Sequence, residues 1–194
     1  CIEPIQDVTE LREAIQRLNA GKASGASGVT REHLLHLPDW VLEDVLVVTQ
    51  QMMAGHTPPN LKLGVVRCLA KDEYRFRPLT MLEPLYKVVM NEFSRKLLKI
   101  LHETGLMGEV QWGFLIDGAA DAPLRIMDAV YSEAANEETT PAHVAFLDMM
   151  EAYPSVTHPT LDVAMARIGA PESVIEWLRQ TLHRQRRRPT VGSE

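Results

Sequence analysis

The strongest constraint on the fold of this 194-residue chain is the helical spacing of its apolar residues. Apolar side chains that recur every three or four positions are typical of helices that bury one face. The clearest such run ends at Gly105 and comprises Leu85, Val88, Val89, Phe93, Leu97 and Leu101. Further runs follow residues that can cap or start a helix, namely Asp7 or Thr9, Thr30, Asp39, Pro123 and Pro171. We therefore expect most of the chain to be helical.

Three short stretches depart from this helical pattern. Residues 64–71 and 77–82 are rich in extended-chain formers and predict a β-hairpin with its turn at 72–76. Residues 143–148 form an apolar run that ends on Asp148, which is typical of a buried strand that delivers one carboxylate at its end. The predicted fold class is therefore α+β. The alternative is an all-helical domain in which these three stretches are extended loops.

The composition of the chain argues against several classes of protein. The net charge of −6 argues against a domain that holds nucleic acid by bulk positive charge, so any such contact must be local. No stretch approaches the ~20 apolar residues of a membrane span, so we expect none. The two cysteines, Cys1 and Cys68, fit a reducing intracellular compartment (nucleus, cytoplasm or organelle). The histidines show no zinc-ligand spacing with them, and no segment resembles a hydrolase nucleophile elbow.

Asp148 is the most informative residue on physical grounds. A carboxylate at the end of a buried strand is costly unless a cation, a metal ion or backbone donors compensate its charge. One interpretation is therefore a functional acid. The other is an aspartate that caps the turn from the strand to the next helix.

Four segments, in order along the chain, bear on this choice. They are residues 21–25 with Gly28; residues 69–71 followed by 77–82 and 86–87; residues 111–114; and residues 146–153 with Ser155, Val156 and His158. They resemble, respectively, the loop that opens the fingers, the fingers hairpin with its following helix, the Gln-x-Gly-Phe segment and the first catalytic palm motif. The family is the reverse transcriptases of non-long-terminal-repeat retroelements and group II introns. The resemblance runs from about residue 5 to about residue 183.

The resemblance implies a domain organisation and a function. Residues 1–140 would form a mainly helical, fingers-like region with a small β-hairpin, and residues 141–194 the first part of a polymerase palm. The chain would be a fragment of an RNA-directed DNA polymerase that works on an RNA template and a DNA primer. It begins with Cys1 and ends on what looks like the lead into another element, so we expect it to be part of a longer protein.

The family's chemistry uses two divalent ions, and hard oxygen ligands suit Mg²⁺. By resemblance, Asp148 is the catalytic, metal-binding carboxylate and the backbone carbonyl of Met149 is an additional ligand. Tyr153 corresponds to the ring that lies against the sugar of the incoming nucleotide and favours deoxynucleotides. The alternative for Tyr153 is a core tyrosine.

Basic and polar residues complete the implied site. Lys71 and Arg77 match fingers residues that fold over the triphosphate, whereas Gln111 and Phe114 fit a segment near the template and the nucleotide pocket. The alternative for Lys71 and Arg77 is that they are solvent-exposed charges of the hairpin without a ligand. The alternative for the segment with Gln111 and Phe114 is a structural role, as a turn and a core position. A terminal basic cluster would contact nucleic-acid phosphates or would simply be a solvated helix end; its members are Arg184, Arg186, Arg187 and Arg188.

The chain also departs from the family pattern. Ser27 stands where the fingers loop usually has an aspartate, and Pro154 where the palm motif often has a second acid. Residues 117–120 replace a Gly-Arg-Ser-Thr-like stretch and lose its cation, which weakens template or nucleotide contacts.

The sequence contains no Asp-Asp pair, and the second and third palm motifs and the thumb are not recognisable. We therefore expect the isolated chain to be inactive, because one carboxylate does not complete a two-metal site. The alternative function is a domesticated, retroelement-derived subunit without catalytic activity, which binds protein partners in a larger assembly.

Overall fold

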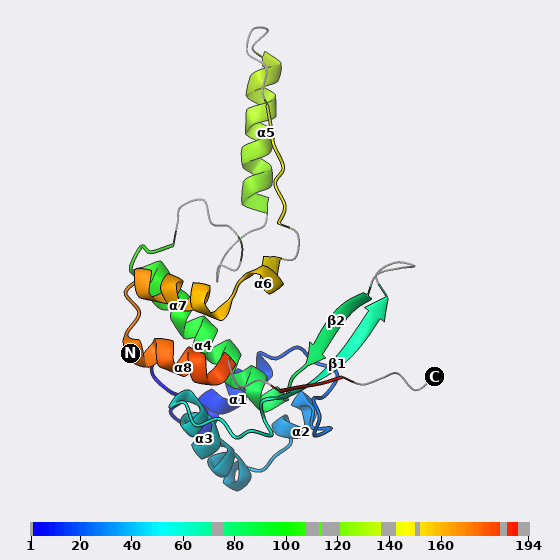
Figure 1. Cartoon of the computed structure of the whole chain (residues 1–194), viewed down its shortest axis with the longest axis vertical. Coiled ribbons are helices and arrows are strands. Elements are labelled where there is room, and N and C mark those ends of the chain that lie inside the picture. The colour runs from blue at the N-terminus through cyan, green and yellow to red at the C-terminus, as the bar shows by residue number, and fades with distance from the viewer. Residues whose placement is uncertain are drawn as a thin grey trace. The chain divides into compact units, whose positions relative to one another are not determined.

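The structure, a computed structural model, describes residues 2–70, 76–107, 113, 121–136, 143–149, 152–182 and 186–189 (Figure 1). The chain divides into two compact units, one formed by Cys1–Lys96 with His158–Glu194 and the other by Leu97–Thr157. Helices with a small sheet confirm the α+β class. In the part of the chain that the structure describes, no helix is both long and apolar enough to cross a membrane.

The first unit begins with three helices, α1 (Val8–Gln16), α2 (Arg31–Leu35) and α3 (Asp39–Met53), close to the predicted positions. The Asp7 carboxylate caps α1 by accepting a hydrogen bond from the Glu10 amide at 2.8 Å. Thr30 and His33 form a reciprocal capping box at α2. The apolar faces enclose one core, made by Ile5, Leu11, Ala14, Ile15, Leu18, Leu34, Leu42 and Val88.

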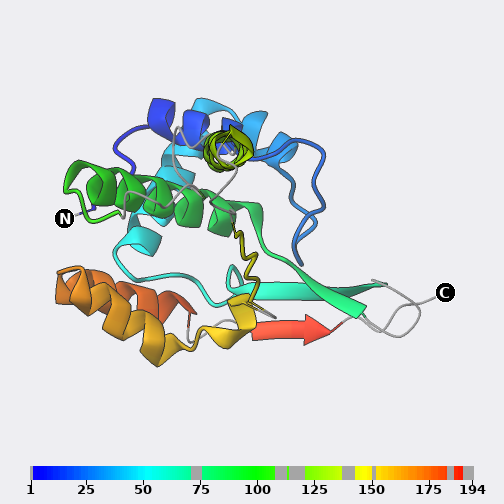
Figure 2. The ribbon, with the colours of Figure 1, turned by 90° about the horizontal axis from the view of Figure 1, so that it is seen from above.

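Helix α4 (Pro84–Glu103) contributes Val88 to this core and, within the first unit, lies between α1 and α8 (Glu172–Leu182) (Figure 2). The Trp177 indole of α8 stacks on Phe93 of α4 with ring centroids 4.0 Å apart, and its N–H donates to the Met52 carbonyl at 2.8 Å. Arg179 joins α8 to α7 (His158–Arg167) through Asp162 at 2.9 Å. The C-terminal helices therefore return to the N-terminal half of the chain.

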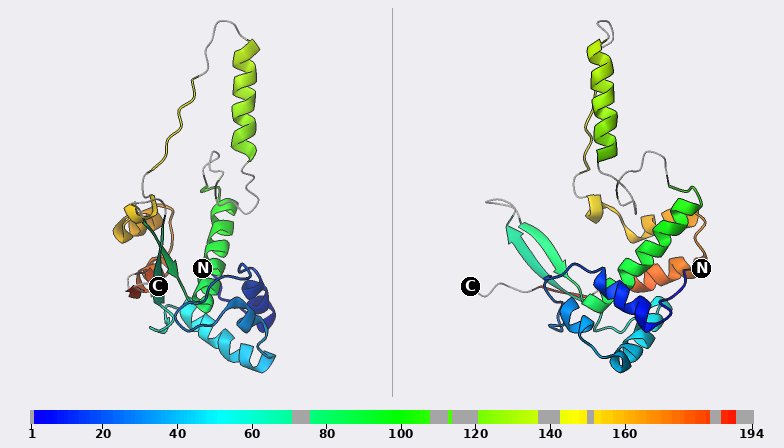
Figure 3. Two further views of the ribbon diagram at one scale, coloured as in Figure 1. Left: turned by 90° about the vertical axis from the view of Figure 1, so that its right-hand side faces the viewer. Right: turned by 180° about the vertical axis from the view of Figure 1, so that it is seen from behind.

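Strands β1 (Leu63–Ala70) and β2 (Phe76–Met81) pair antiparallel, which confirms the predicted hairpin (Figure 3). A third strand, β3 (Arg186–Pro189), adds to β1 in parallel, so that the sheet order is β2-β1-β3. Pro78 lies on β2, an edge strand, where a missing backbone N–H is tolerated.

The predicted buried strand at residues 143–148 is wrong. Residues 143–149 are extended but belong to no sheet, and the side chains of Phe146 and Leu147 are 78% and 95% exposed. A strand requires a neighbouring strand to satisfy its backbone groups, and an apolar run alone does not supply one. The strand that joins β1 is instead Arg186–Pro189, in the basic cluster.

The second unit contains the C-terminal end of α4, helix α5 (Asp121–Asn136) and the short α6 (Ala152–Ser155). None of its residues whose exposure is described is buried. Helix α5 instead exposes apolar side chains, including Leu124, Ile126 and Tyr131.

A buried carboxylate joins α1 to α4. Glu92 is only 2% exposed and faces three cations, with Arg17 at 3.1 Å, Lys96 at 3.8 Å and Arg95 in a bidentate contact. Burial by itself raises the pKa of Glu92, but the Arg95 hydrogen bond and the three positive charges together hold that pKa below its ordinary value of 4.5. Glu92 is therefore a carboxylate that folding stabilises in its charged form.

A second carboxylate organises the glycine-rich loop at residues 21–28. Glu83, 3% exposed, accepts hydrogen bonds from the Ser27 amide at 2.8 Å and from the Ser27 hydroxyl at 2.5 Å. A Cβ atom at Gly25 would lie 2.6 Å from the Glu83 carboxylate, so only glycine fits there. The family's aspartate at position 27 would therefore face a carboxylate in this chain.

Glu92→Gln is expected to lower the free energy of unfolding by about 2 kcal/mol near neutral pH, because three cations lose their shared anion. Since the folded-state pKa lies below 4.5, the stabilisation is present above that pH and is lost as the pH falls through the folded-state value. Denaturant unfolding of both proteins should therefore show a difference that shrinks below pH 4.5. The matched control is Glu103→Gln, which removes an exposed ion pair with Lys99 on α4 and should change stability by less than ~0.5 kcal/mol.

Ser27→Asp is expected to destabilise the fold by roughly 1–3 kcal/mol, because it places a second carboxylate against Glu83. Adding Glu83→Gln to Ser27→Asp should recover part of this loss, since an amide donates to the new carboxylate. A double-mutant cycle by thermal unfolding measures the coupling. Ala26→Asp, at an exposed position of the same loop, is the control; equal destabilisation by both aspartates would contradict the Glu83 contact as the cause.

Candidate functional site

Asp148, the predicted metal-binding acid, lies in the second unit within the extended stretch 143–149. Its side chain is exposed, as is that of Met149 at 70%. Because Asp148 is exposed, its charge does not need a partner to compensate for burial, contrary to what the sequence predicted. In the described part of the chain, no three His, Cys, Asp or Glu side chains gather into a possible metal site.

The other predicted residues of the second unit are described only in part. The backbone of Tyr153 belongs to α6, whereas Gln111 and Phe114 lie outside the described residues. Arg77 belongs to the first unit and Asp148 to the second, so the position of each residue is given only within its own unit.

Arg77 lies on β2 next to the turn that joins the two strands of the hairpin, and Lys71 lies outside the described residues. The register pairs Arg77 with Leu69, and Leu79 with Arg67, so these four residues share one face of the hairpin. All four are exposed. This face therefore presents two guanidinium groups interleaved with two leucines, and Arg67 is a residue that sequence reasoning missed.

Of the terminal basic cluster, Arg186, Arg187 and Arg188 belong to β3, and Arg184 lies outside the described residues. The parallel register pairs Arg188 with Val65 and Arg186 with Leu63. Because paired residues share a face, positions 186 and 188 lie on the same sheet face as positions 67 and 77. Arg186, Arg187 and Arg188 thus belong to the sheet that carries Arg77.

The same sheet face leads to a hollow of about 470 Å³ in the first unit, here called the α1–β2–α4 hollow. Its walls come from the end of α1, the following loop, the start of α2, the end of β2 and the first turns of α4. The lining residues are Arg17, Leu18, Asn19, Lys22, Ala23, Arg31, Leu79, Thr80, Met81, Pro84, Lys87 and Asn91. Four are cationic and none is acidic. No sequence spacing signals this set, because its cations come from separate elements.

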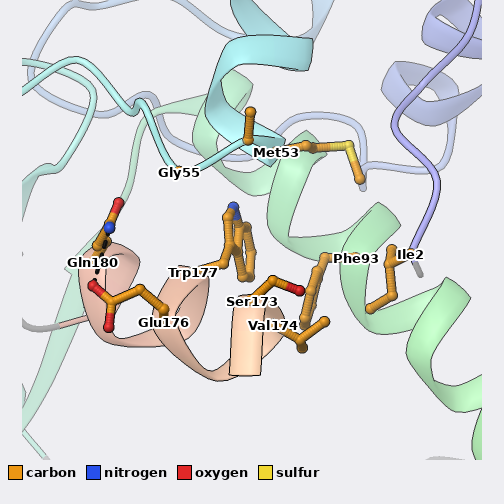
Figure 4. Close-up of a pocket in the computed structure, with 10 residues that line it drawn as sticks. Ile2, Met53, Gly55, Phe93, Ser173, Val174, Glu176, Trp177 and Gln180 are labelled. Atoms are coloured by element: carbon orange, nitrogen blue, oxygen red, sulfur yellow. Dashed lines mark hydrogen bonds between the residues drawn. The ribbon is translucent and has the colours of Figure 1, made fainter. Parts of the chain in front are cut away.

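A second cavity of about 330 Å³ lies where α3, α4 and α8 meet. Figure 4 shows the Trp177 and Phe93 side chains beside each other on its wall, with the Gln180 amide bonded to Glu176 at 3.0 Å. Apart from Glu176, its lining side chains are uncharged, and most are apolar. This cavity borders the packing contact that anchors α8 and holds none of the predicted site residues.

Comparison with known proteins connects the chain to one group. No protein-family model matches it. The chain is 25% identical over 179 residues to the RNA-directed DNA polymerase from mobile element jockey, and 25% identical over 157 residues to the probable RNA-directed DNA polymerase from transposon X-element, both of Drosophila melanogaster. It is 23% identical over 185 residues to the retrovirus-related Pol polyprotein from type-2 retrotransposable element R2DM of the same organism.

These matches cover 87%, 77% and 90% of this chain, respectively. They cover only 19%, 17% and 16% of the relatives, so the chain spans less than a fifth of the length of each curated protein that it matches. The resemblance identified from the sequence motifs is confirmed: over most of its length, this chain is similar to the reverse transcriptases of non-long-terminal-repeat retrotransposons.

Proposed function

We propose that this chain is the fingers-like region and the beginning of the palm of an RNA-directed DNA polymerase. The observation that carries the proposal is the order of the four motifs along a chain that is similar over 87% of its length to the jockey polymerase. In this proposal residues 1–140 are fingers-like and residues 141–194 belong to the palm. The substrates are deoxynucleotides, an RNA template and a DNA primer.

The sheet supports a role in holding phosphates. Arg67 and Arg77 are exposed on one face of the hairpin, and a guanidinium group donates a fork of hydrogen bonds that matches phosphate oxygens. We propose that Arg77, together with Lys71, contacts the triphosphate of the nucleotide. Gln111 and Phe114 complete the proposed contacts to the nucleotide and the template. Phosphate contacts to the nucleic acid are proposed for the terminal basic cluster, Arg184, Arg186, Arg187 and Arg188.

Asp148 is the proposed metal-binding carboxylate. Its exposed oxygens, with the carbonyl of Met149, are hard donors of the kind that Mg²⁺ prefers. In the family's chemistry, bound Mg²⁺ lowers the pKa of the primer hydroxyl and neutralises charge on the triphosphate. Asp148 is one carboxylate, so this chemistry requires further acidic residues beside it. We therefore propose that the chain contributes to a polymerase site and does not form a complete site by itself.

Asp148→Asn is expected to reduce primer extension on an RNA template by roughly 100-fold or more, because the amide does not replace the anionic metal ligand. The assay uses Mg²⁺ and deoxynucleotides, with the chain alone and with a second polypeptide that carries the remaining polymerase motifs. Asp128→Asn, which alters an exposed acid on α5, is the control and should leave extension unchanged. Absence of extension in every mixture that contains folded chain would contradict the polymerase proposal.

Tyr153→Ala is expected to raise the incorporation of ribonucleotides relative to deoxynucleotides by roughly tenfold or more in the same assay. The proposed reason is that the ring at this position excludes the 2′-hydroxyl of the incoming sugar. The measurement is the ratio of kcat/KM values for the two nucleotide classes. A variant that loses activity with both classes equally would instead indicate a structural role for Tyr153.

A further inference from the structure

We propose that the α1–β2–α4 hollow binds the sugar–phosphate backbone of a single-stranded nucleic acid, with Lys22 and Lys87 as its phosphate contacts. The choice of a nucleic acid as the ligand rests on the proposed function, and the site itself rests on the side chains that line the hollow. This site is separate from the triphosphate contacts proposed for Lys71 and Arg77.

The four cations in the hollow differ in whether other residues of the protein bind them. Two are already held by the protein: Arg31 donates to the carbonyls of Ile15 and Gln16 at 3.3 and 3.0 Å, and Arg17 pairs with Glu92 at 3.1 Å. Lys22 and Lys87, in contrast, have no ion pair with any residue that the structure describes. Their ammonium groups are thus available to an external anion, which lysine binds as a point charge.

Acidic residues near the hollow already bind other groups of the protein. Glu92 pairs with Arg17, Arg95 and Lys96, and Glu83 accepts from Ser27. Glu32 accepts from the Gly21 amide at 3.0 Å, a hydrogen bond that contributes most to lowering its pKa to about 2. Since none of the three lines the hollow, all the charged side chains that line it are cationic.

The lining of the hollow indicates a ligand with both a charged and an apolar part. The hollow combines the cations with an apolar part formed by Leu18, Leu79, Met81 and Pro84. A nucleotide unit matches this combination, because it pairs an anionic phosphate with a sugar and base that can cover apolar surface. A free phosphate ion has no such apolar part.

The hollow is continuous with one face of the sheet. Leu79 lines the hollow and also belongs to the hairpin face that carries Arg67 and Arg77. Positive charge therefore extends from the hollow along β1 and β2. A linear polyanion in the hollow can extend to Arg67, the register partner of Leu79, and leave Arg77 to the proposed triphosphate contact. Each phosphate that a cation of the protein neutralises adds a salt-dependent contribution to affinity.

The test is the binding of a fluorescently labelled single-stranded RNA to the complete 194-residue chain, followed by anisotropy without divalent metal. Lys22→Gln combined with Lys87→Gln should weaken binding roughly tenfold and make the slope of log K against log salt shallower by about 1.4. The control combines Lys99→Gln with Arg167→Gln, which removes the same charge from exposed positions outside the hollow. It should change affinity by less than about twofold.

Several results would overturn the inference. Equal affinity of the hollow variant and the wild type would exclude the hollow as a binding site, and equal loss in the control would indicate bulk charge. Inorganic phosphate or a nucleoside triphosphate that competes as well as an unlabelled oligonucleotide would show that the hollow takes a small anion. If folded wild-type chain binds no RNA, the proposed function fails as well, whereas binding that is insensitive to Lys22 and Lys87 removes only this inference. Circular dichroism checks that the variants fold.

Discussion

The arrangement of the first unit depends on the ion pairs between Glu92 and the cations that surround it. This carboxylate is almost fully buried, and only the surrounding cations make its charge tolerable. Arg17 comes from the end of α1, so the pair holds that helix end against α4. Lys96 extends the contact by pairing with Glu10 at 2.8 Å and donating to the carbonyl of Glu3 at 3.1 Å. The N-terminal segment, α1 and α4 are therefore held together by one network of charges.

The rest of the unit is assembled around α4. Phe93 lies one residue after Glu92 and stacks on Trp177, so adjacent positions of α4 hold α1 and α8. At the start of α4, Glu83 holds the glycine-rich loop through Ser27. These contacts place Arg17, Lys22 and Lys87 around one hollow. A helix whose main role is structural thereby determines where positive charge gathers on a chain with a net charge of −6.

The second unit presents a different situation. It buries none of the residues whose exposure is described, and it exposes Phe146, Leu147 and the apolar side chains of α5. Apolar surface of this kind gains stability when other protein covers it. Asp148 lies in this unit, next to the exposed apolar run. The positioning of Asp148 in a catalytic site would therefore depend on contacts beyond those that the unit makes by itself.

The sequence by itself determined the helices, the hairpin and the family resemblance. Capping at Asp7, the apolar period before Gly105 and the composition of β1 are local properties, and each acts over only a few residues. Only the tertiary structure decided that Arg186–Pro189 joins β1 while residues 143–149 do not form a strand. It also decided that Glu83 takes the contact with Ser27 and that Lys22 and Lys87 share one hollow. These features join residues far apart in the chain, and such contacts depend on packing and charge that no local pattern encodes.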